Sequence, residues 1–181
     1  LRIIARNARV LEAVPMGNIA AAQSNFNKAN SMSANNPVVQ NNLGAVALKN
    51  GDLKQAEIYF GAATGAGDEV NYNKGIVAIK SGDYAAAVNY FGQCNCVNAA
   101  LANVLAGNNN EALKKLNAEN KECPMSYYLK AVIGARTNDA TAVIENLRKA
   151  CSLDGSFKQL AATDMEFAKF FENNDFIAIT K

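Results

Sequence analysis

The chain has no histidine and no tryptophan among its 181 residues. Histidine is the commonest general base near neutral pH and the commonest metal ligand, so its absence weighs against hydrolytic and metal-dependent catalysis. The four cysteines follow none of the common zinc spacings, and no glycine-rich phosphate loop is present. These cysteines are Cys94, Cys96, Cys123 and Cys151. We therefore expect no enzyme activity, no cofactor and no metal site.

An excess of charge of one sign is also absent. The chain has 18 basic and 16 acidic residues, which gives a formal net charge of +2, and it contains no long run of charges of one sign. A nucleic-acid-binding surface needs a concentrated basic patch, so we expect no nucleic-acid partner. No stretch reaches the roughly 18 uninterrupted apolar residues that a membrane-spanning helix requires, so we expect no membrane insertion by this segment.

The compartment and the oligomeric state stay open. Cysteines that are expected to be reduced thiols favour the cytoplasm. An asparagine-rich composition that resembles bacterial proteins instead suits a periplasmic or cell-envelope protein whose signal peptide has been removed. The chain starts at Leu1 without an initiator methionine. We expect it to be a fragment or a processed form of a longer protein.

A pattern of small and aromatic residues recurs along the chain. Gly51 is followed at 5, 9 and 12 residues by Ala56, Phe60 and Ala63. Steps of four and three residues place these three side chains on one face of a helix. Gly51 and the following Asp52 predict a turn that ends one helix and caps the next. The pattern predicts a hairpin of two helices.

The same pattern starts at five turn positions with spacings of 34, 31, 25 and 31 residues. The turn residues are Gly17, Gly51, Gly82, Gly107 and Asn138. A hairpin of this kind cannot bury its apolar face alone, so successive copies must stack. The 25-residue step removes more than two helical turns, which we assign to the first helix of the fourth copy. We expect the superhelix to be distorted there.

At these residues the chain resembles the tetratricopeptide repeat family, whose unit has Leu-Gly in its first helix, Gly-Asp in the turn, and Ala, an aromatic or Leu, and Ala in its second. The resemblance is strongest at residues 37–67, 68–92 and 124–155. It implies an all-α fold, a right-handed solenoid of stacked helix-turn-helix repeats, within a single domain at 1–181. The expected repeats are about 3–36, 37–67, 68–95, 96–123 and 124–155.

The repeat pattern stops after Gly155, and five of the eight phenylalanines follow it. We interpret residues 156–181 as a cap of two or three short helices that covers the last repeat. An aromatic docking motif for another protein is the alternative. Four acidic side chains are expected on the polar outer face of the cap: Asp164, Glu166, Glu172 and Asp175.

We interpret the cysteines as ordinary buried or half-buried thiols. A disulfide between Cys96 and Cys123 is an alternative, since both lie near the starts of neighbouring predicted helices. Cys123 precedes Pro124 at a helix start, where its pKa could be lowered, but no second catalytic partner is visible.

The resemblance also implies a concave groove in which the first helices of the repeats bind a peptide or a partner's helix. Asn42 and Asn73 hold the place at which peptide-binding members of the family use asparagine, and an amide can both donate to and accept from a peptide bond. Basic side chains recur two residues before three of the turns, where an ordinary solvated face is the alternative. The predicted protein-binding residues are Asn41, Asn42, Leu48, Lys49, Tyr72, Asn73, Ile79, Lys80, Tyr128 and Arg136. The alternative function is an architectural or oligomerisation segment of a larger cell-envelope protein.

Overall fold

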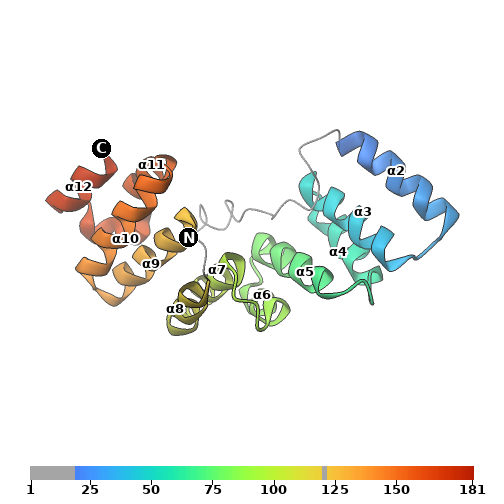
Figure 1. The fold of residues 1–181 in the computed structure, drawn as a ribbon, viewed down its shortest axis with the longest axis horizontal. Helices are drawn as coiled ribbons and strands as arrows, with labels where there is room; N and C mark the ends of the chain where they lie inside the picture. Colours follow the sequence, from blue (N-terminus) through green and yellow to red (C-terminus); the bar gives the residue numbers. More distant parts are fainter. Residues whose placement is uncertain (1–18, 120–121) are drawn as a thin grey trace. The chain divides into compact units, whose positions relative to one another are not determined.

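The computed structural model describes residues 19–119 and 122–181, and every regular element within these residues is a helix (Figure 1). The predicted all-α repeat fold is therefore confirmed. The described residues form two compact units, which join in the sequence between Gly92 and Gln93. One continuous superhelical domain over residues 1–181 stays a prediction. The first helix expected for the repeat at 3–36, with its turn at Gly17, lies outside the described residues.

In the first unit, helices that are consecutive in the sequence pack against each other. Its described helices are α2 (Ile19–Met32), α3 (Pro37–Lys49), α4 (Leu53–Ala62), α5 (Asp68–Ser81) and α6 (Tyr84–Phe91). Pairs α3–α4 and α5–α6 are two helical hairpins. Because α3 also contacts α5, the first helices of the two hairpins lie next to each other.

The second unit continues with two further hairpins and a helical cap. Its described elements are α7 (Val97–Leu105), α8 (Asn109–Ala118), α9 (Pro124–Thr137), α10 (Ala140–Leu153), α11 (Ser156–Thr163), the 3-10 helix η1 (Met165–Phe170) and α12 (Asn174–Thr180). Helix α7 packs against α8, α9 packs against α10, and the two first helices α7 and α9 contact each other.

The turns inside the hairpins have the structure that the sequence predicts. Gly82 ends α5 with a left-handed backbone, φ 84°, and the side chain of Asp83 accepts a hydrogen bond from the Ala86 amide at 2.9 Å. Asn138 adopts the same left-handed conformation after α9, with φ 58°. Asparagine tolerates this region better than other non-glycine residues, which explains why it can replace glycine in this turn.

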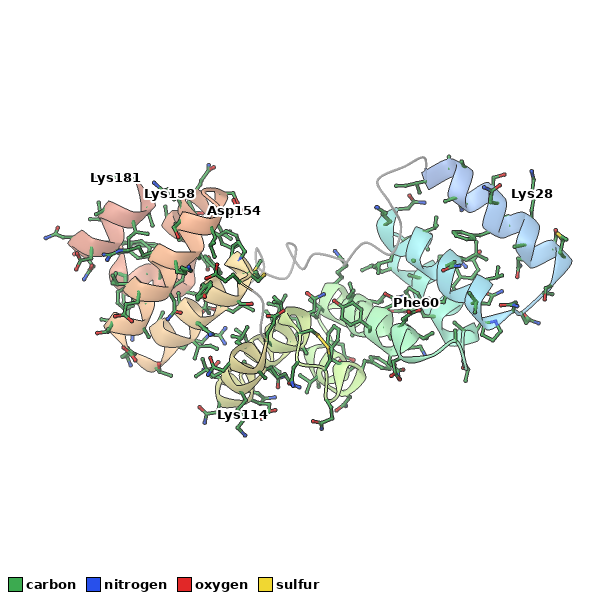
Figure 2. All side chains as sticks on the ribbon, viewed as in Figure 1. Lys28, Phe60, Lys114, Asp154, Lys158 and Lys181 are labelled. Atoms are coloured by element: carbon green, nitrogen blue, oxygen red, sulfur yellow. A yellow bond between two sulfur atoms is a disulfide. The ribbon has the colours of Figure 1, made fainter. Side chains whose placement is uncertain are left out.

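The small and aromatic stripe is the packing contact within both hairpins of the first unit. A Cβ atom built on Gly44 of α3 would lie 2.5 Å from the ring of Phe60 on α4, and one on Gly75 of α5 would lie 2.7 Å from the ring of Phe91 on α6. Phe60, which is labelled in Figure 2, is completely buried, and Phe91 is 5% exposed. Each glycine therefore leaves the space that an aromatic ring fills.

The contraction between the third and fourth turns falls on two helices. Helix α7 has 9 residues, whereas the first helices α3 and α5 have 13 and 14. The shortening of the fourth repeat's first helix is confirmed. The assignment of the whole contraction to that helix is wrong, because α6 has only 8 residues against 10 in α4.

The cap consists of three short helices that pack on the last hairpin: α11 and α12 contact α10, and η1 contacts α9. Its aromatic side chains are mostly core, in accord with the packing interpretation. The buried ones are Phe157, Phe167, Phe170 and Phe176.

The outer face expected for all four acidic residues of the cap is wrong for two of them. Glu172 and Asp175 are exposed, as expected. Asp164 is only 2% exposed, and the side chain of Glu166 is 10% exposed, because both carboxylates bind side chains of α9. The cap is therefore joined to α9 by polar as well as apolar contacts.

Among the helices of residues 19–119 and 122–181, none is both long enough and apolar enough to cross a membrane.

Candidate functional site

The first helices of the two hairpins in the first unit are joined by a pair of predicted site residues. The side-chain amide of Asn73 on α5 donates to the side-chain oxygen of Asn41 on α3 at 3.0 Å. Asn41 is 8% exposed, while Asn73 and its equivalent in the preceding repeat, Asn42, are half-buried. An amide has more hydrogen-bonding capacity than one bond uses, so this contact does not exhaust Asn73.

Lys49 and Lys80 occupy equivalent places in consecutive repeats. Each lies in the last turn of its first helix, Lys49 in α3 and Lys80 in α5, and each is half-buried. A cation is favoured at a helix C-terminus, because the carbonyl groups there carry partial negative charge. The two ammonium groups give this end of the helix pair a basic character.

Tyr72 adds an aromatic surface to α5. It is half-buried, and its ring meets Phe91 edge to face, with 5.4 Å between the ring centroids and an interplanar angle of 76°. Because Phe91 is held against Gly75, the Tyr72 ring rests on the packed core of its own hairpin. Such a ring presents apolar area at a low entropic cost.

Three predicted site residues are core side chains. Leu48 is 3% exposed, Ile79 is 1% exposed and Tyr128 is completely buried. They support the helices from inside, and their side chains give a ligand almost no surface. The other predicted residues on α3 and α5 are more accessible than these.

Tyr128 connects α9 to the cap. Its hydroxyl group donates to Asp164 Oδ2 at 2.8 Å, and its ring lies against Phe157 and Phe167 with centroid distances of 5.2 and 5.6 Å. Burial, followed by the nearby negative charge of Asp164, raises the pKa of Tyr128 far above its ordinary value of 10.0. The phenol therefore stays protonated and acts as a hydrogen-bond donor.

Arg136 is held in a network inside the second unit. Its Nε and Nη2 atoms donate to the two carboxylate oxygens of Glu166 at 2.8 and 2.9 Å. Its Nη1 atom donates to the Val104 carbonyl at 2.6 Å and to Asn109 Oδ1 at 3.3 Å. One guanidinium group thus connects α9 with α7, α8 and the cap. The sequence alone did not identify Glu166 as its partner, and no local pattern links two residues 30 positions apart.

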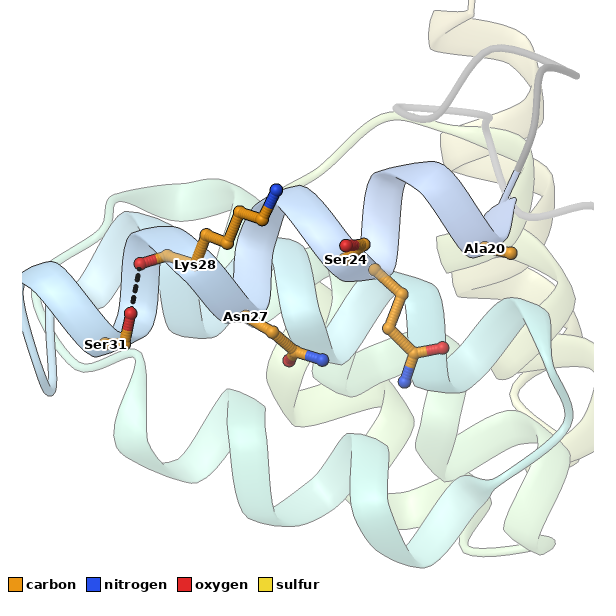
Figure 3. A pocket seen from close by; sticks show the side chains of 6 residues that line it. Ala20, Ser24, Asn27, Lys28 and Ser31 are labelled. Carbon is orange, nitrogen blue, oxygen red and sulfur yellow. Dashed lines mark hydrogen bonds between the residues drawn. The ribbon is translucent and has the colours of Figure 1, made fainter.

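A polar hollow runs along α2 (Figure 3). The Ser31 hydroxyl group donates to the Lys28 carbonyl at 2.7 Å on this face. The residues that line the hollow are Ala20, Gln23, Ser24, Asn27, Lys28 and Ser31. All of them lie on one helix, and only Lys28 is charged. This composition offers no acid–base pair.

The cysteines correct two expectations. Cys94 forms a disulfide with Cys96, so the expectation of ordinary thiols is wrong for these two, and so is the alternative bridge between Cys96 and Cys123. Cys123 is a half-buried thiol and Cys151 is a buried one. Burial raises the pKa of Cys151, which makes it a poor nucleophile. Within residues 19–119 and 122–181, no three cysteine or carboxylate side chains gather as metal ligands.

Successive helical hairpins with left-handed turn residues at equivalent positions, two of them with the same small-to-aromatic contact, define a helical-repeat protein. Such a protein presents its function on the surface of stacked units rather than in one deep pocket. Residues 68–100, which contain α5, α6 and the start of α7, match the family described as tetratricopeptide repeat. No curated protein matches the chain. Repeats of this family act as scaffolds for protein–protein interaction, which makes a protein the expected class of partner.

Proposed function

We propose that the chain is a non-enzymatic scaffold that binds a segment of a partner protein along α3 and α5. The observation that carries the proposal is the hydrogen bond between Asn73 and Asn41, since it joins the first helices of consecutive repeats. Side chains at equivalent positions then recur one repeat apart, as a ligand that follows the two helices requires.

The proposed contact surface consists of five side chains with complementary roles. Its members are Asn42, Lys49, Tyr72, Asn73 and Lys80, all half-buried. The asparagine amides can donate to and accept from the partner's backbone. The lysines attract carboxylates, and the tyrosine ring covers an apolar side chain. These groups favour an acidic partner segment that also carries an apolar residue.

The remaining predicted residues take supporting roles in this proposal. Asn41, Leu48 and Ile79 hold α3 and α5 in place, while Tyr128 and Arg136 hold the cap on α9. The proposal thus needs only the first unit for contact with the partner.

Reversing both charges of the surface, in Lys49→Glu with Lys80→Glu, is expected to lower partner retention about tenfold, because two attractive contacts become repulsive. Retention is measured by quantitative mass spectrometry of proteins captured on the immobilised chain from a lysate of its own source. The matched control is Lys28→Glu with Lys54→Glu, which makes the same change of net charge on exposed positions of α2 and α4.

The control pair should retain the partner at the level of the unmodified chain, and circular dichroism should show all three proteins equally helical. Equal losses in both double variants would mean that only net charge matters. Unchanged retention in the Lys49 and Lys80 variant would place binding on another face. A chain that is dimeric in light scattering without any partner would favour the architectural alternative.

A further inference from the structure

The disulfide between Cys94 and Cys96 lies in the short connection between α6 and α7 (Figure 2). The two cysteines are two positions apart, and their Cα atoms are 5.5 Å from each other. Both are half-buried, and Asn95 between them is exposed. The bond is therefore near the surface and does not lie within a hydrophobic core.

This disulfide contributes little to holding the fold together. A crosslink stabilises a protein mainly by restricting its unfolded chain, and the effect falls as the closed loop becomes shorter. A bridge across two positions closes nearly the shortest loop possible and joins no distant elements. Helix α7 is also held by direct contacts with α8 and α9.

The position of Cys96 suits a thiolate. Cys96 is the N-cap residue of α7, a helix of 9 residues, and its side chain caps no backbone amide while the disulfide is intact. A side-chain acceptor at the N-cap can bind the amides of the first turn, and the partial positive charge there lowers the pKa of a cysteine. Reduction would supply such an acceptor at the start of α7.

A second source of positive charge, in addition to the start of α7, lies beside Cys94. The ammonium group of Lys115, on α8, donates to the Cys94 carbonyl oxygen at 3.1 Å, and Lys115 is only 6% exposed. A positive charge held near a cysteine pair stabilises the thiolate that forms when their bond breaks. Helix α8 thus contributes to the environment of the pair, together with the start of α7.

We propose that Cys94 and Cys96 are a redox-active pair that exchanges disulfides with a dithiol on another protein. The grounds are their disulfide, its place near the surface, the N-cap position of Cys96 and the nearby ammonium group of Lys115. A thiolate of the partner attacks Cys94 Sγ, which forms a mixed disulfide and releases Cys96 as a thiolate. The partner's second thiolate then attacks the sulfur of the partner's first cysteine in the mixed disulfide, and Cys94 is released as a thiolate. The partner dithiol loses two electrons and two protons and becomes a disulfide; Cys94 and Cys96 gain the two electrons, and the two protons go to their sulfur atoms or to solvent.

The test mixes the oxidised chain with a synthetic peptide that carries two cysteines as the dithiol probe. Acid quenching, alkylation and peptide mass spectrometry then count the oxidised and reduced cysteines. One equivalent of chain should form one equivalent of peptide disulfide. The variant Cys94→Ser with Cys96→Ser should form none, whereas Cys123→Ser, which removes a half-buried free thiol, should match the unmodified chain.

The reduced chain gives a second readout. Cys96 should be alkylated about tenfold faster than Cys94 at neutral pH, because the N-cap favours its thiolate. Lys115→Gln should slow peptide oxidation about fivefold, while Lys114→Gln, a change at an exposed neighbour, should leave the rate unchanged.

Circular dichroism distinguishes a redox pair from a structural bridge. The proposal requires the same helix content in the oxidised and reduced chain. Loss of helix on reduction, failure to oxidise the peptide, or equal alkylation rates of Cys94 and Cys96 would each overturn it. None of these results depends on partner binding along α3 and α5, so the two proposals fail separately.

Discussion

Replacing Arg136 with methionine is expected to destabilise the second unit by about 3–5 kcal/mol. The side chains of Arg136 and Glu166 are 20% and 10% exposed, so the substitution leaves a mostly buried carboxylate without its charge partner. The Val104 carbonyl oxygen also loses the donor that it accepts from at 2.6 Å. Urea denaturation of the chain, followed by circular dichroism, measures the free energy of unfolding.

The double variant Arg136→Met with Glu166→Met is the informative control. Replacing both members of a buried ion pair by apolar side chains is often nearly neutral, so the double variant should recover at least half of the lost stability. If the double variant were as unstable as Arg136→Met alone, the contact of Arg136 with Val104 would matter more than its pair with Glu166.

Replacing Gly44 with alanine is expected to destabilise the first unit by about 2 kcal/mol, even though alanine favours helix formation by about 1 kcal/mol relative to glycine. The added Cβ atom would lie 2.5 Å from the ring of Phe60, and that ring is completely buried, so neighbouring core atoms resist its displacement. Overpacking of the hairpin therefore outweighs the gain in helix propensity. Denaturant unfolding measures the net change.

A second substitution identifies the cause of this loss. In a Phe60→Leu background the shorter side chain leaves room for the Cβ atom, so adding Gly44→Ala should be neutral or stabilising by up to about 1 kcal/mol. An equal loss in both backgrounds would show that Phe60 is not the group that alanine displaces at position 44.

The hairpins could be predicted from the sequence because their determinants are local. Gly82 specifies a turn through its left-handed backbone, and Asp83 through the cap that its side chain forms. In each repeat the residues of the packing stripe follow the turn within about a dozen positions. Repetition strengthens such a signal, because each weak copy supports the others. The packing of Gly75 on Phe91 follows directly from this pattern.

The polar contacts of the cap could not be predicted in this way. Asp164 and Glu166 have the composition of a solvated surface, and they are buried only because Tyr128 and Arg136 approach them from α9. The contact between the cap and α9 depends on how the chain folds back after α10, and no repeating pattern of residues in the sequence predicts this. From sequence alone, acidic residues in such a segment are expected to face solvent.

The alternative pairing of Cys96 with Cys123 is wrong for a related reason. Position at the start of neighbouring helices suggested Cys96 and Cys123, but a disulfide needs Cα atoms within about 7 Å, which the sequence does not give. Cys94 meets this requirement for Cys96 at 5.5 Å, because two residues that are two positions apart always have Cα atoms within about 7 Å. Here the shortest sequence separation indicated the partner better than helix position did.

For the candidate site, the family resemblance assigned residues to the first helices but did not separate surface from core. Asn73 was expected to bind a ligand, and in the structure it also binds Asn41 of the preceding repeat. Leu48 and Ile79 were grouped with it, although both are core side chains. The exposure of a side chain depends on how neighbouring repeats pack together, and the residue pattern within one repeat does not determine that packing.

The most direct test of binding along α3 and α5 is site-specific photo-crosslinking. A photo-reactive phenylalanine derivative replaces Tyr72 on α5 in one protein and Ile58 on α4 in another; Ile58 is 63% exposed and serves as the control. After irradiation with a lysate of its own source, the derivative at position 72 should form a covalent adduct with a partner protein, and the derivative at position 58 should form none. An adduct from position 58 without one from position 72 would contradict the account.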